Sequence, residues 1–331
     1  MHKLGLTLGK FAPLHRGHEF MIETALAQVD RLIVIIYACD ELPLVSLVER
    51  VGWLQKLYPH LEVLPAPDGP KETGYIPAIM RAQENYILKV LAGRKITHFF
   101  SSEPYGEHVS LALGAQDVRV DMPRQIVPIS ATRIRQDWTL AQQYLHPLIY
   151  QSLVQKIVLL GAPSAGKTTL AAALAQALNT KWVAEYGRTY WEQNQQDRRL
   201  QPEELLLIAQ THIQLEDAAA LKAQRYLICD TNAFTTWHFA HYYHGSALPE
   251  LTQLAEQCWQ RYAQVWVCDI DFPYADTWER SGEVNQHEFQ AFILQYLQDK
   301  QIPYRLVSGT VGERVKTILQ DMPPDRLCTK R

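Results

Sequence analysis

The sequence has few cysteines, no long apolar run and almost no excess charge. Its five cysteines are widely scattered and include no Cys-x-x-Cys pair, which argues against a zinc site or a disulfide framework. No stretch approaches the ~18 apolar residues of a membrane span, and a strand-like run follows Met1 where a signal peptide would stand. The formal net charge of −3 provides no broad positive field for nucleic acid. We therefore expect a cytoplasmic protein with reduced thiols that binds neither membranes nor nucleic acid.

The length of 331 residues fits two domains of ordinary size, each able to bury its own core. Short apolar runs alternate with longer helical patterns, which is typical of α/β domains with parallel sheets. We predict two doubly wound parallel-sheet domains, residues 1–150 and 151–331, with a break near His146-Pro147. The predicted strands are residues 4–8, 31–37, 61–64 and 97–101 in the first domain and 156–160, 182–184, 226–230, 265–269 and 304–307 in the second.

The first motif, residues 9–18 (GKFAPLHRGH), follows the first predicted strand. His15 and His18 are three residues apart, so both imidazoles lie on one face of a helix's first turn and can reach one phosphate. A transfer at the α-phosphate of a nucleoside triphosphate needs an in-line nucleophile and groups that stabilise the phosphate oxygens. We assign that stabilisation to His15 and His18, and contact with the triphosphate to Lys10. The pair alone would more often be an ordinary helix start.

A second element, residues 129–135 (ISATRIR), independently favours a phosphate site. Ser130 can cap a helix whose N-terminus offers free backbone donors, with Arg133 and Arg135 close by. Seen alone, this pattern would be an ordinary capped helix with solvated arginines. Its occurrence together with residues 9–18 makes a nucleotide site the better interpretation.

The third motif, residues 161–169 (GAPSAGKTT), matches the phosphate loop Gly-x4-Gly-Lys-Ser/Thr in full. It follows an apolar strand and precedes an alanine-rich helix predicted over 170–178. In such loops backbone N–H groups cradle the phosphates, so we assign Lys167 to the β/γ oxygens and the Thr168 hydroxyl to Mg²⁺. We therefore expect ATP as co-substrate and Mg²⁺ as cofactor of this domain.

Two acids and two arginines complete the predicted second site. Asp230 ends an apolar run as a Walker-B-like acid would, so we assign it to the Mg²⁺ shell. Glu185 ends the preceding strand, and we propose it as the base for a substrate hydroxyl. The two roles could be exchanged, and either acid could simply cap a helix. Arg188 and Arg280 are candidates for charge stabilisation at the transferred phosphoryl group, with solvated loop arginines as the alternative.

Together these motifs resemble the NadR family. Residues 9–18, 101–106 and 129–135 are similar to its nicotinamide mononucleotide adenylyltransferase domain, and residues 161–169 and 185–188 to its ribosylnicotinamide kinase domain. The resemblance implies that the kinase makes nicotinamide mononucleotide from nicotinamide riboside and ATP. The transferase then joins the mononucleotide to the adenylyl group of a second ATP, giving NAD and pyrophosphate. Some relatives carry an N-terminal helix-turn-helix repressor domain, but this chain starts at the first transferase strand, so we expect no DNA-binding regulation.

The resemblance also implies roles for single residues. Lys10, His15, His18 and Arg135 would handle the triphosphate, and residues 101–106 would lie near the nucleotide. The other predicted ATP-binding residues are Gly9, Phe11, Ser130, Thr132, Arg133, Gly161, Ser164, Ala165, Gly166 and Thr169. The predicted substrate-binding residues are Ser102, Glu103, Tyr105, Gly106, Trp138, Arg188, Asp271, Tyr274, Asp276 and Arg280.

Two of these substrate assignments have a specific chemical basis. Trp138 is a candidate for stacking on a pyridine or adenine ring, although a helix-borne tryptophan is more often a core residue. The segment with Asp271, Tyr274 and Asp276 resembles the family's Asp-x-Pro-aromatic segment near the nucleoside. Pyridinium is a cation, so an aromatic face with a carboxylate suits it.

Other functions stay open from the sequence. Phosphate motifs report the triphosphate better than the acceptor, so a fused kinase and nucleotidyltransferase could act on another nucleoside. A nucleotide-sensing regulator would bind without turnover, and a degenerate domain would serve only for docking. The intact residues Lys167, Thr168, His15 and His18 argue against these last two. Transferases of this kind often form homo-oligomers, and the number of subunits is open.

Overall fold

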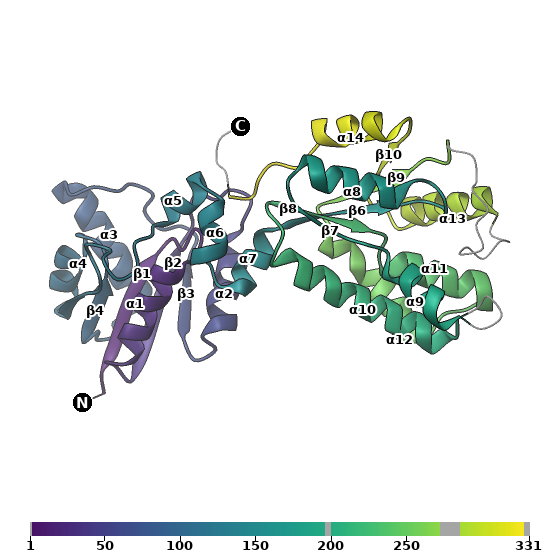
Figure 1. Cartoon of the computed structure of the whole chain (residues 1–331). Helices are drawn as coiled ribbons and strands as arrows, with labels where there is room; N and C mark the ends of the chain where they lie inside the picture. Colours follow the sequence, from purple (N-terminus) through teal and green to yellow (C-terminus); the bar gives the residue numbers. More distant parts are fainter. Residues whose placement is uncertain (1, 196–199, 272–284, 328–331) are drawn as a thin grey trace. The chain divides into compact units, whose positions relative to one another are not determined.

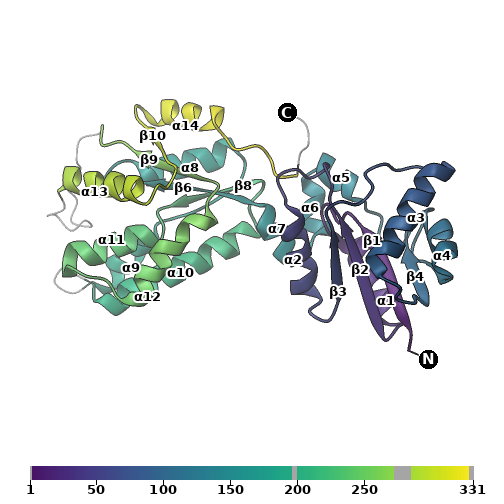
Figure 2. The same cartoon turned by 180° about the vertical axis from the view of Figure 1, so that it is seen from behind.

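The computed structural model describes residues 2–195, 200–271 and 285–327. It divides the chain into two compact units, Met1–Leu153 with Asp325–Arg331 (unit 1) and Val154–Pro324 (unit 2). Each unit contains a five-stranded sheet in which all strand pairs are parallel, with helices on both faces (Figures 1 and 2). The predicted α/β class with two doubly wound parallel sheets is confirmed.

Unit 1 has the strand order β3-β2-β1-β4-β5. Its strands are β1 (Leu4–Gly9), β2 (Arg31–Tyr37), β3 (Glu62–Ala66), β4 (His98–Ser101) and β5 (Gln116–Arg119). Its helices are α1 (Arg16–Leu26), α2 (Leu47–Leu57), α3 (Pro77–Leu91), α4 (Gly106–Leu113), α5 (Ala131–Gln136), α6 (Thr139–Tyr144) and α7 (Pro147–Leu153). The chain leaves β1 toward β2 and leaves β4 toward β5, so the connections that follow these two paired central strands run in opposite directions. Ligands bind at such a point in open α/β sheets.

The strand β5 was missed by the sequence analysis. It reads Gln-Asp-Val-Arg, its first two residues are exposed, and it lies at the edge of the sheet. An edge strand with polar residues has no apolar run to reveal it. The buried centre of β2, by contrast, consists of Leu, Ile and Val, and its predicted bounds agree with the structure.

Unit 2 has the strand order β10-β9-β6-β8-β7. Its strands are β6 (Gln155–Leu160), β7 (Lys181–Val183), β8 (Tyr226–Asp230), β9 (Gln264–Cys268) and β10 (Arg305–Val307). Its helices are α8 (Lys167–Ala177), α9 (Tyr186–Asn194), α10 (Pro202–Ala220), α11 (Ala233–His244), α12 (Pro249–Gln257), η1 (Cys258–Arg261), α13 (Gln286–Asp299) and α14 (Val311–Gln320). The central strand β6 is buried at every position. Helices α8 and α14 pack on one side of the sheet, and α10, α11 and α12 lie on the other (Figures 1 and 2).

The composition led us to expect reduced thiols and no membrane-spanning segment. Cys229, Cys258 and Cys268 are buried and Cys39 is half-buried, and all four are free thiols. Cys328 lies outside the described residues. Within the described ranges, none of the helices has the length and apolar character needed to cross a membrane.

Candidate active sites

Unit 1 contains a cavity of about 630 Å³ at the carboxyl ends of its central strands. A volume of several hundred Å³ suits a nucleotide-sized ligand. The cavity brings together residues from motifs that are more than 100 positions apart in the chain. The predicted site residues that line it are Gly9, Lys10, Phe11, His15, His18, Ser102, Glu103, Tyr105, Ser130, Thr132 and Arg135.

The two histidines cap α1 reciprocally. His15 Nδ1 accepts from the Gly17 amide at 3.1 Å, and His18 Nδ1 accepts from the His15 amide at 3.3 Å. Their rings stack with centroids 3.7 Å apart. Because both Nδ1 atoms are acceptors, the proton of each neutral ring lies on Nε2, which is left as a donor.

The electrostatics keep both imidazoles uncharged. Burial and the charge of Arg124 lower the pKa of His15 to about 3. Burial, the neighbouring His15 and Arg124 lower the pKa of His18 well below its usual range. At neutral pH the pair therefore offers hydrogen-bond donors to a phosphate, while the positive charges in the cavity come from Lys10, Arg124 and Arg135.

This lowered pKa predicts a pH-dependent stability. Below about pH 6.5 the unfolded chain binds a proton at His15 and the folded chain does not. The contribution of neutral His15 to the free energy of unfolding is therefore complete above pH 6.5 and is lost as the pH falls toward 3. Between about pH 7 and pH 5 the unfolding free energy of the wild type should therefore fall, and in His15→Gln this fall should be smaller by about 2 kcal/mol. Urea unfolding at both pH values measures this. The exposed control His60→Gln should leave the fall unchanged, and an equal effect of both variants would contradict the prediction.

Buried arginines hold the loop that carries the first motif. Arg50 from α2 is 1% exposed and donates to the carbonyls of Lys10 and Tyr37, the latter at 2.9 Å. Arg135 donates to the Ala12 carbonyl at 2.5 Å, so this predicted triphosphate contact also fixes the loop. The Lys10 ammonium forms an ion pair with Glu41. The roles of Arg50 and Glu41 were not predictable from the sequence, because neither residue lies in a recognisable motif.

Arg124 also lines the cavity, although no motif in the sequence pointed to it. It lies within a turn in which the Asp121 carboxylate accepts from the backbone amides of residues 125–127. Its guanidinium lies 2.5 Å from Glu103 Oε1, and its charge acts on both histidines. The predicted residue Glu103 is thus paired with a cation that itself lines the cavity.

Three predicted residues of unit 1 do not line this cavity. Trp138 is buried against Tyr150, with ring centroids 5.7 Å apart, as a core residue. Arg133 is exposed and donates to a backbone carbonyl at 2.7 Å. A Cβ atom at Gly106 would lie 2.1 Å from Ser101 Oγ, so close packing requires glycine there.

The phosphate loop of unit 2 connects β6 to α8. Gly161 and Gly166 have φ angles of +139° and +79°, and a Cβ atom at Gly161 would lie 2.8 Å from the Cys268 carbonyl oxygen. Glycine is therefore required by both backbone conformation and space. Lys167 is 8% exposed, and its Nζ donates to the carbonyls of Gly161 and Ala162 at 3.0 Å each. The ammonium thus lies over the loop that would receive the phosphates.

Asp230 and Thr168 meet directly across this loop. The Thr168 hydroxyl donates to Asp230 Oδ2 at 2.6 Å. Asp230 is fully buried, and its Oδ1 has no hydrogen-bond partner among the described residues. Burial and then the charge of Glu185 raise the pKa of Asp230 to about 6, against the opposing effects of Lys167 and Thr168. A buried, unpartnered carboxylate oxygen beside a hydroxyl fits the oxygen ligands that Mg²⁺ prefers.

Glu185 and Arg188, two further predicted residues of this site, both lie at α9. Glu185 is the N-cap residue of α9 but makes no side-chain capping bond, so its carboxylate is not used as a cap. Arg188 on the same helix lies 3.8 Å from Glu192. Tyr274, Asp276 and Arg280 lie outside the described residues.

The carboxylate of Asp271, a predicted substrate-binding residue, is bonded to other groups of unit 2. Burial opposes ionisation of its carboxyl, but the Gly309 amide and the Arg314 guanidinium outweigh it and lower the pKa. Arg314 is 1% exposed and also donates to the Ala165 carbonyl of the phosphate loop at 2.8 Å. Asp271 thereby anchors the arginine that supports the loop.

Two glutamines of α13 support the loop from another side. Gln290 Oε1 accepts from the Ala162 amide at 2.8 Å, and its Nε2 donates to the Cys268 carbonyl at 3.0 Å. Gln286 Nε2 donates to the Pro163 carbonyl at 2.9 Å. Sequence reasoning missed these glutamines and Arg314, because they follow the loop by more than 100 positions and carry no motif.

Removal of the Arg314 side chain should destabilise unit 2. Arg314→Leu leaves the Asp271 carboxylate and the carbonyls of Ala165, Asp269 and Gly309 without this donor. We expect a loss of about 3 kcal/mol in unfolding free energy, measured by urea denaturation. The control Arg305→Leu breaks a half-exposed ion pair and should cost less than about 1 kcal/mol. Equal losses would refute a special role for Arg314.

Comparisons with known proteins agree with this two-domain arrangement. A cytidylyltransferase-like family model matches residues 6–137, and an AAA-domain model matches residues 156–314. The trifunctional NAD biosynthesis/regulator protein NadR of Escherichia coli K12 is 28% identical over 327 residues, which cover 91% of this chain and 78% of the relative. The protein of the same name from Salmonella typhimurium LT2 gives the same identity and coverage.

Two solved structures share the fold over nearly the whole chain. A NadR protein in complex with NAD and AMP-PNP has a TM-score of 0.59 at 19% identity, covering 97% of this chain and 96% of that chain. A NadR protein in complex with NR has a TM-score of 0.58 at 18% identity, with the same coverage.

Fold and sites together define an enzyme that joins a nucleotidyltransferase domain to a P-loop kinase domain. The sequence similarity extends through both domains and covers 91% of the chain. The resemblance to the NadR family is therefore confirmed.

Proposed function

We propose that the protein is a bifunctional enzyme of NAD biosynthesis. Unit 2 phosphorylates nicotinamide riboside with ATP, and unit 1 adenylylates nicotinamide mononucleotide with ATP to give NAD and pyrophosphate. The observation that carries the proposal is the presence of both phosphate sites in one chain that is similar to NAD biosynthesis proteins along most of its length. The solved relatives in complex with NAD, AMP-PNP and NR support this choice of substrates.

In unit 1, a phosphate oxygen of the mononucleotide attacks the α-phosphorus of ATP in line. The new P–O bond forms as the bond to the β-phosphate breaks, and pyrophosphate leaves. The Nε2–H groups of His15 and His18 donate to the phosphate oxygens as charge develops there. Lys10 and Arg135, with Arg124, supply positive charge for the triphosphate. Ser130 and Thr132 also line this cavity.

In unit 2, the riboside hydroxyl attacks the γ-phosphorus of ATP and ADP leaves. Glu185 accepts the hydroxyl proton, and Lys167 contacts the oxygens of the transferred group. Thr168 and Asp230 would hold Mg²⁺, which neutralises phosphate charge when bound. The direct Thr168–Asp230 contact favours this division of roles over its exchange, since a base bonded to the loop threonine would not be free for the substrate. Arg188 and Arg280 remain candidates for charge stabilisation.

A product assay tests the proposal. Purified protein is incubated with Mg-ATP and nicotinamide riboside, and separately with Mg-ATP and nicotinamide mononucleotide, and the products are separated by chromatography. We expect NAD from both substrates. NAD from the mononucleotide alone would refute riboside phosphorylation by unit 2 and point to another nucleoside. No product from either substrate would refute the proposal as a whole and favour a sensor.

A further inference from the structure

The chain returns to unit 1 after it has completed unit 2. Unit 1 consists of Met1–Leu153 together with Asp325–Arg331, and the structure describes this second piece as far as Leu327. We call residues 325–327 the return segment. The Leu327 side chain is 1% exposed, so the segment is packed into the protein and is not a solvated tail.

Arg326 anchors the return segment through three hydrogen bonds. Its Nη1 donates to the Ser152 carbonyl at 2.6 Å, and its Nη2 donates to the Leu44 carbonyl at 2.9 Å and to Glu49 Oε2 at 2.7 Å. The side chains of Arg326 and Glu49 are 21% and 30% exposed. A half-buried guanidinium with three acceptors is held in one position, unlike a solvated surface pair. The residue therefore joins the end of α7, the loop before α2 and the first turn of α2.

The loop before α2 leads directly to the nucleotide cavity. Glu41, three residues before Leu44, lines the cavity and forms an ion pair with the Lys10 ammonium. Leu42 and Val45 of this loop are 1% and 2% exposed, and the Val45 amide donates to the Leu42 carbonyl at 3.1 Å. Because the loop is packed and internally bonded, a displacement at Leu44 also displaces the carboxylate that holds Lys10.

Helix α2 makes a second connection to the first motif. Arg50, which follows Glu49 directly, is 1% exposed and donates to the Lys10 carbonyl. Trp53 of the same helix donates from Nε1 to Ser152 Oγ at 3.0 Å. The return segment and Trp53 thus both tie α2 to the end of α7. The position of α2 in turn fixes the backbone of Lys10.

We propose that Arg326 is a positioning residue for adenylyl transfer. By bonding Leu44 and Glu49, it fixes the loop and the helix that hold the side chain and the backbone of Lys10. This inference rests on the proposed transferase function of unit 1. It makes the first site dependent on residues that follow the kinase domain in the chain.

The test replaces Arg326 and measures NAD formation from supplied mononucleotide. We expect Arg326→Leu to raise the KM for ATP by about fivefold and to change the KM for the mononucleotide little, because Lys10 serves the triphosphate. Arg326→Lys keeps the charge beside Glu49 without the guanidinium fork, so it should recover part of this change. Riboside phosphorylation by unit 2 should be unchanged in both variants.

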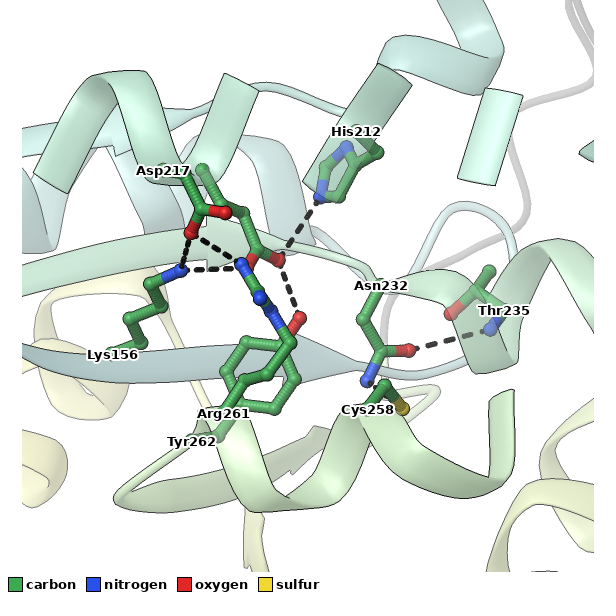
Figure 3. A network of polar contacts seen from close by, with 9 residues as sticks. Lys156, His212, Asp217, Asn232, Thr235, Cys258, Arg261 and Tyr262 are labelled. Carbon is green, nitrogen blue, oxygen red and sulfur yellow. Dashed lines mark hydrogen bonds and ion pairs between the residues drawn. The ribbon is translucent and has the colours of Figure 1, made fainter. Parts of the chain in front are cut away.

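Two controls separate positioning from general stability. Arg31→Leu breaks an exposed ion pair with Glu62 at the amino end of β2 and should leave both KM values unchanged. Tyr262→Phe removes a hydroxyl that donates to the buried Glu216 carboxylate of unit 2, within the polar cluster of Figure 3. It should lower the melting temperature without affecting adenylyl transfer. If Arg326→Leu likewise lowers only the melting temperature and leaves the KM for ATP unchanged, the inference is overturned.

Glu49→Gln tests the same connection from the side of α2. The change keeps the shape of the side chain and removes its charge, so we expect the KM for ATP to rise in the same direction by about twofold. The double variant Arg326→Leu/Glu49→Gln should be no worse than Arg326→Leu, since both changes break one pair. Multiplied effects in the double variant would refute the proposed connection. Should Arg326→Leu not fold, an unchanged KM for ATP in Glu49→Gln would also refute it.

A binding measurement separates this inference from the proposed function. In a Lys167→Ala background, which disables the phosphate loop of unit 2, calorimetric titration with Mg-AMP-PNP reports unit 1. Arg326→Leu should weaken this binding by about fivefold. If the wild type forms no NAD, the proposed function fails, and this affinity still decides the role of Arg326. If the wild type is active and Arg326→Leu shows an unchanged affinity and KM, only the inference fails.

Discussion

Lys167→Ala is expected to abolish phosphorylation of nicotinamide riboside and to spare adenylyl transfer to supplied nicotinamide mononucleotide. The Lys167 ammonium is the cation that lies over the phosphate loop, 3.0 Å from the carbonyls of Gly161 and Ala162. Without it, the loop has no positive charge of its own to stabilise the transferred phosphoryl group. We expect kcat to fall by at least about 10³-fold. Chromatographic measurement of both products in parallel detects the change.

A matched control uses a lysine of the same unit outside the loop. Lys181 is exposed on β7, so Lys181→Ala should retain both activities. Retention of riboside phosphorylation by Lys167→Ala would refute the assignment of the loop to the kinase reaction. Loss of both activities in a folded Lys167→Ala protein would refute the division of the reactions between two sites.

His18→Ala is expected to have the reverse effect, with adenylyl transfer lost and riboside phosphorylation retained. The change removes one Nε2–H donor and also the ring that stacks on His15 at 3.7 Å and accepts from its amide. Since the donor and the orientation of its neighbour are lost together, we expect kcat for NAD formation to fall by about 10²- to 10³-fold. Formation of NAD from supplied mononucleotide measures the loss.

The exposed residue His60 provides the control for this second change. His60→Ala should form NAD at the wild-type rate. A rate for His18→Ala within a few-fold of the wild type would show that the histidine pair only caps α1. A parallel loss of the kinase activity in a folded protein would contradict the two-site assignment.

Much of the fold was predictable because it depends on local patterns. The buried strands β2 and β8 are apolar runs, and their predicted bounds agree with the structure. The edge strand β5 was not predictable, because its residues are polar and its pairing with β4 exists only in the folded sheet. For Trp138 the sequence left two roles open, because its position did not distinguish stacking on a ligand from burial against Tyr150.

The parts of the sites that are contiguous in the chain were determined by the sequence alone. The histidine pair depends on a spacing within one helical turn, and the phosphate loop depends on glycines at fixed places, so both follow from local geometry. Only the tertiary structure decided which distant side chains complete them. Arg50, Arg124 and Arg314 reach their partners because parallel strands with helical crossovers bring together segments that lie many residues apart in the chain. Those contacts leave no periodic or spaced pattern in the sequence from which they could be inferred.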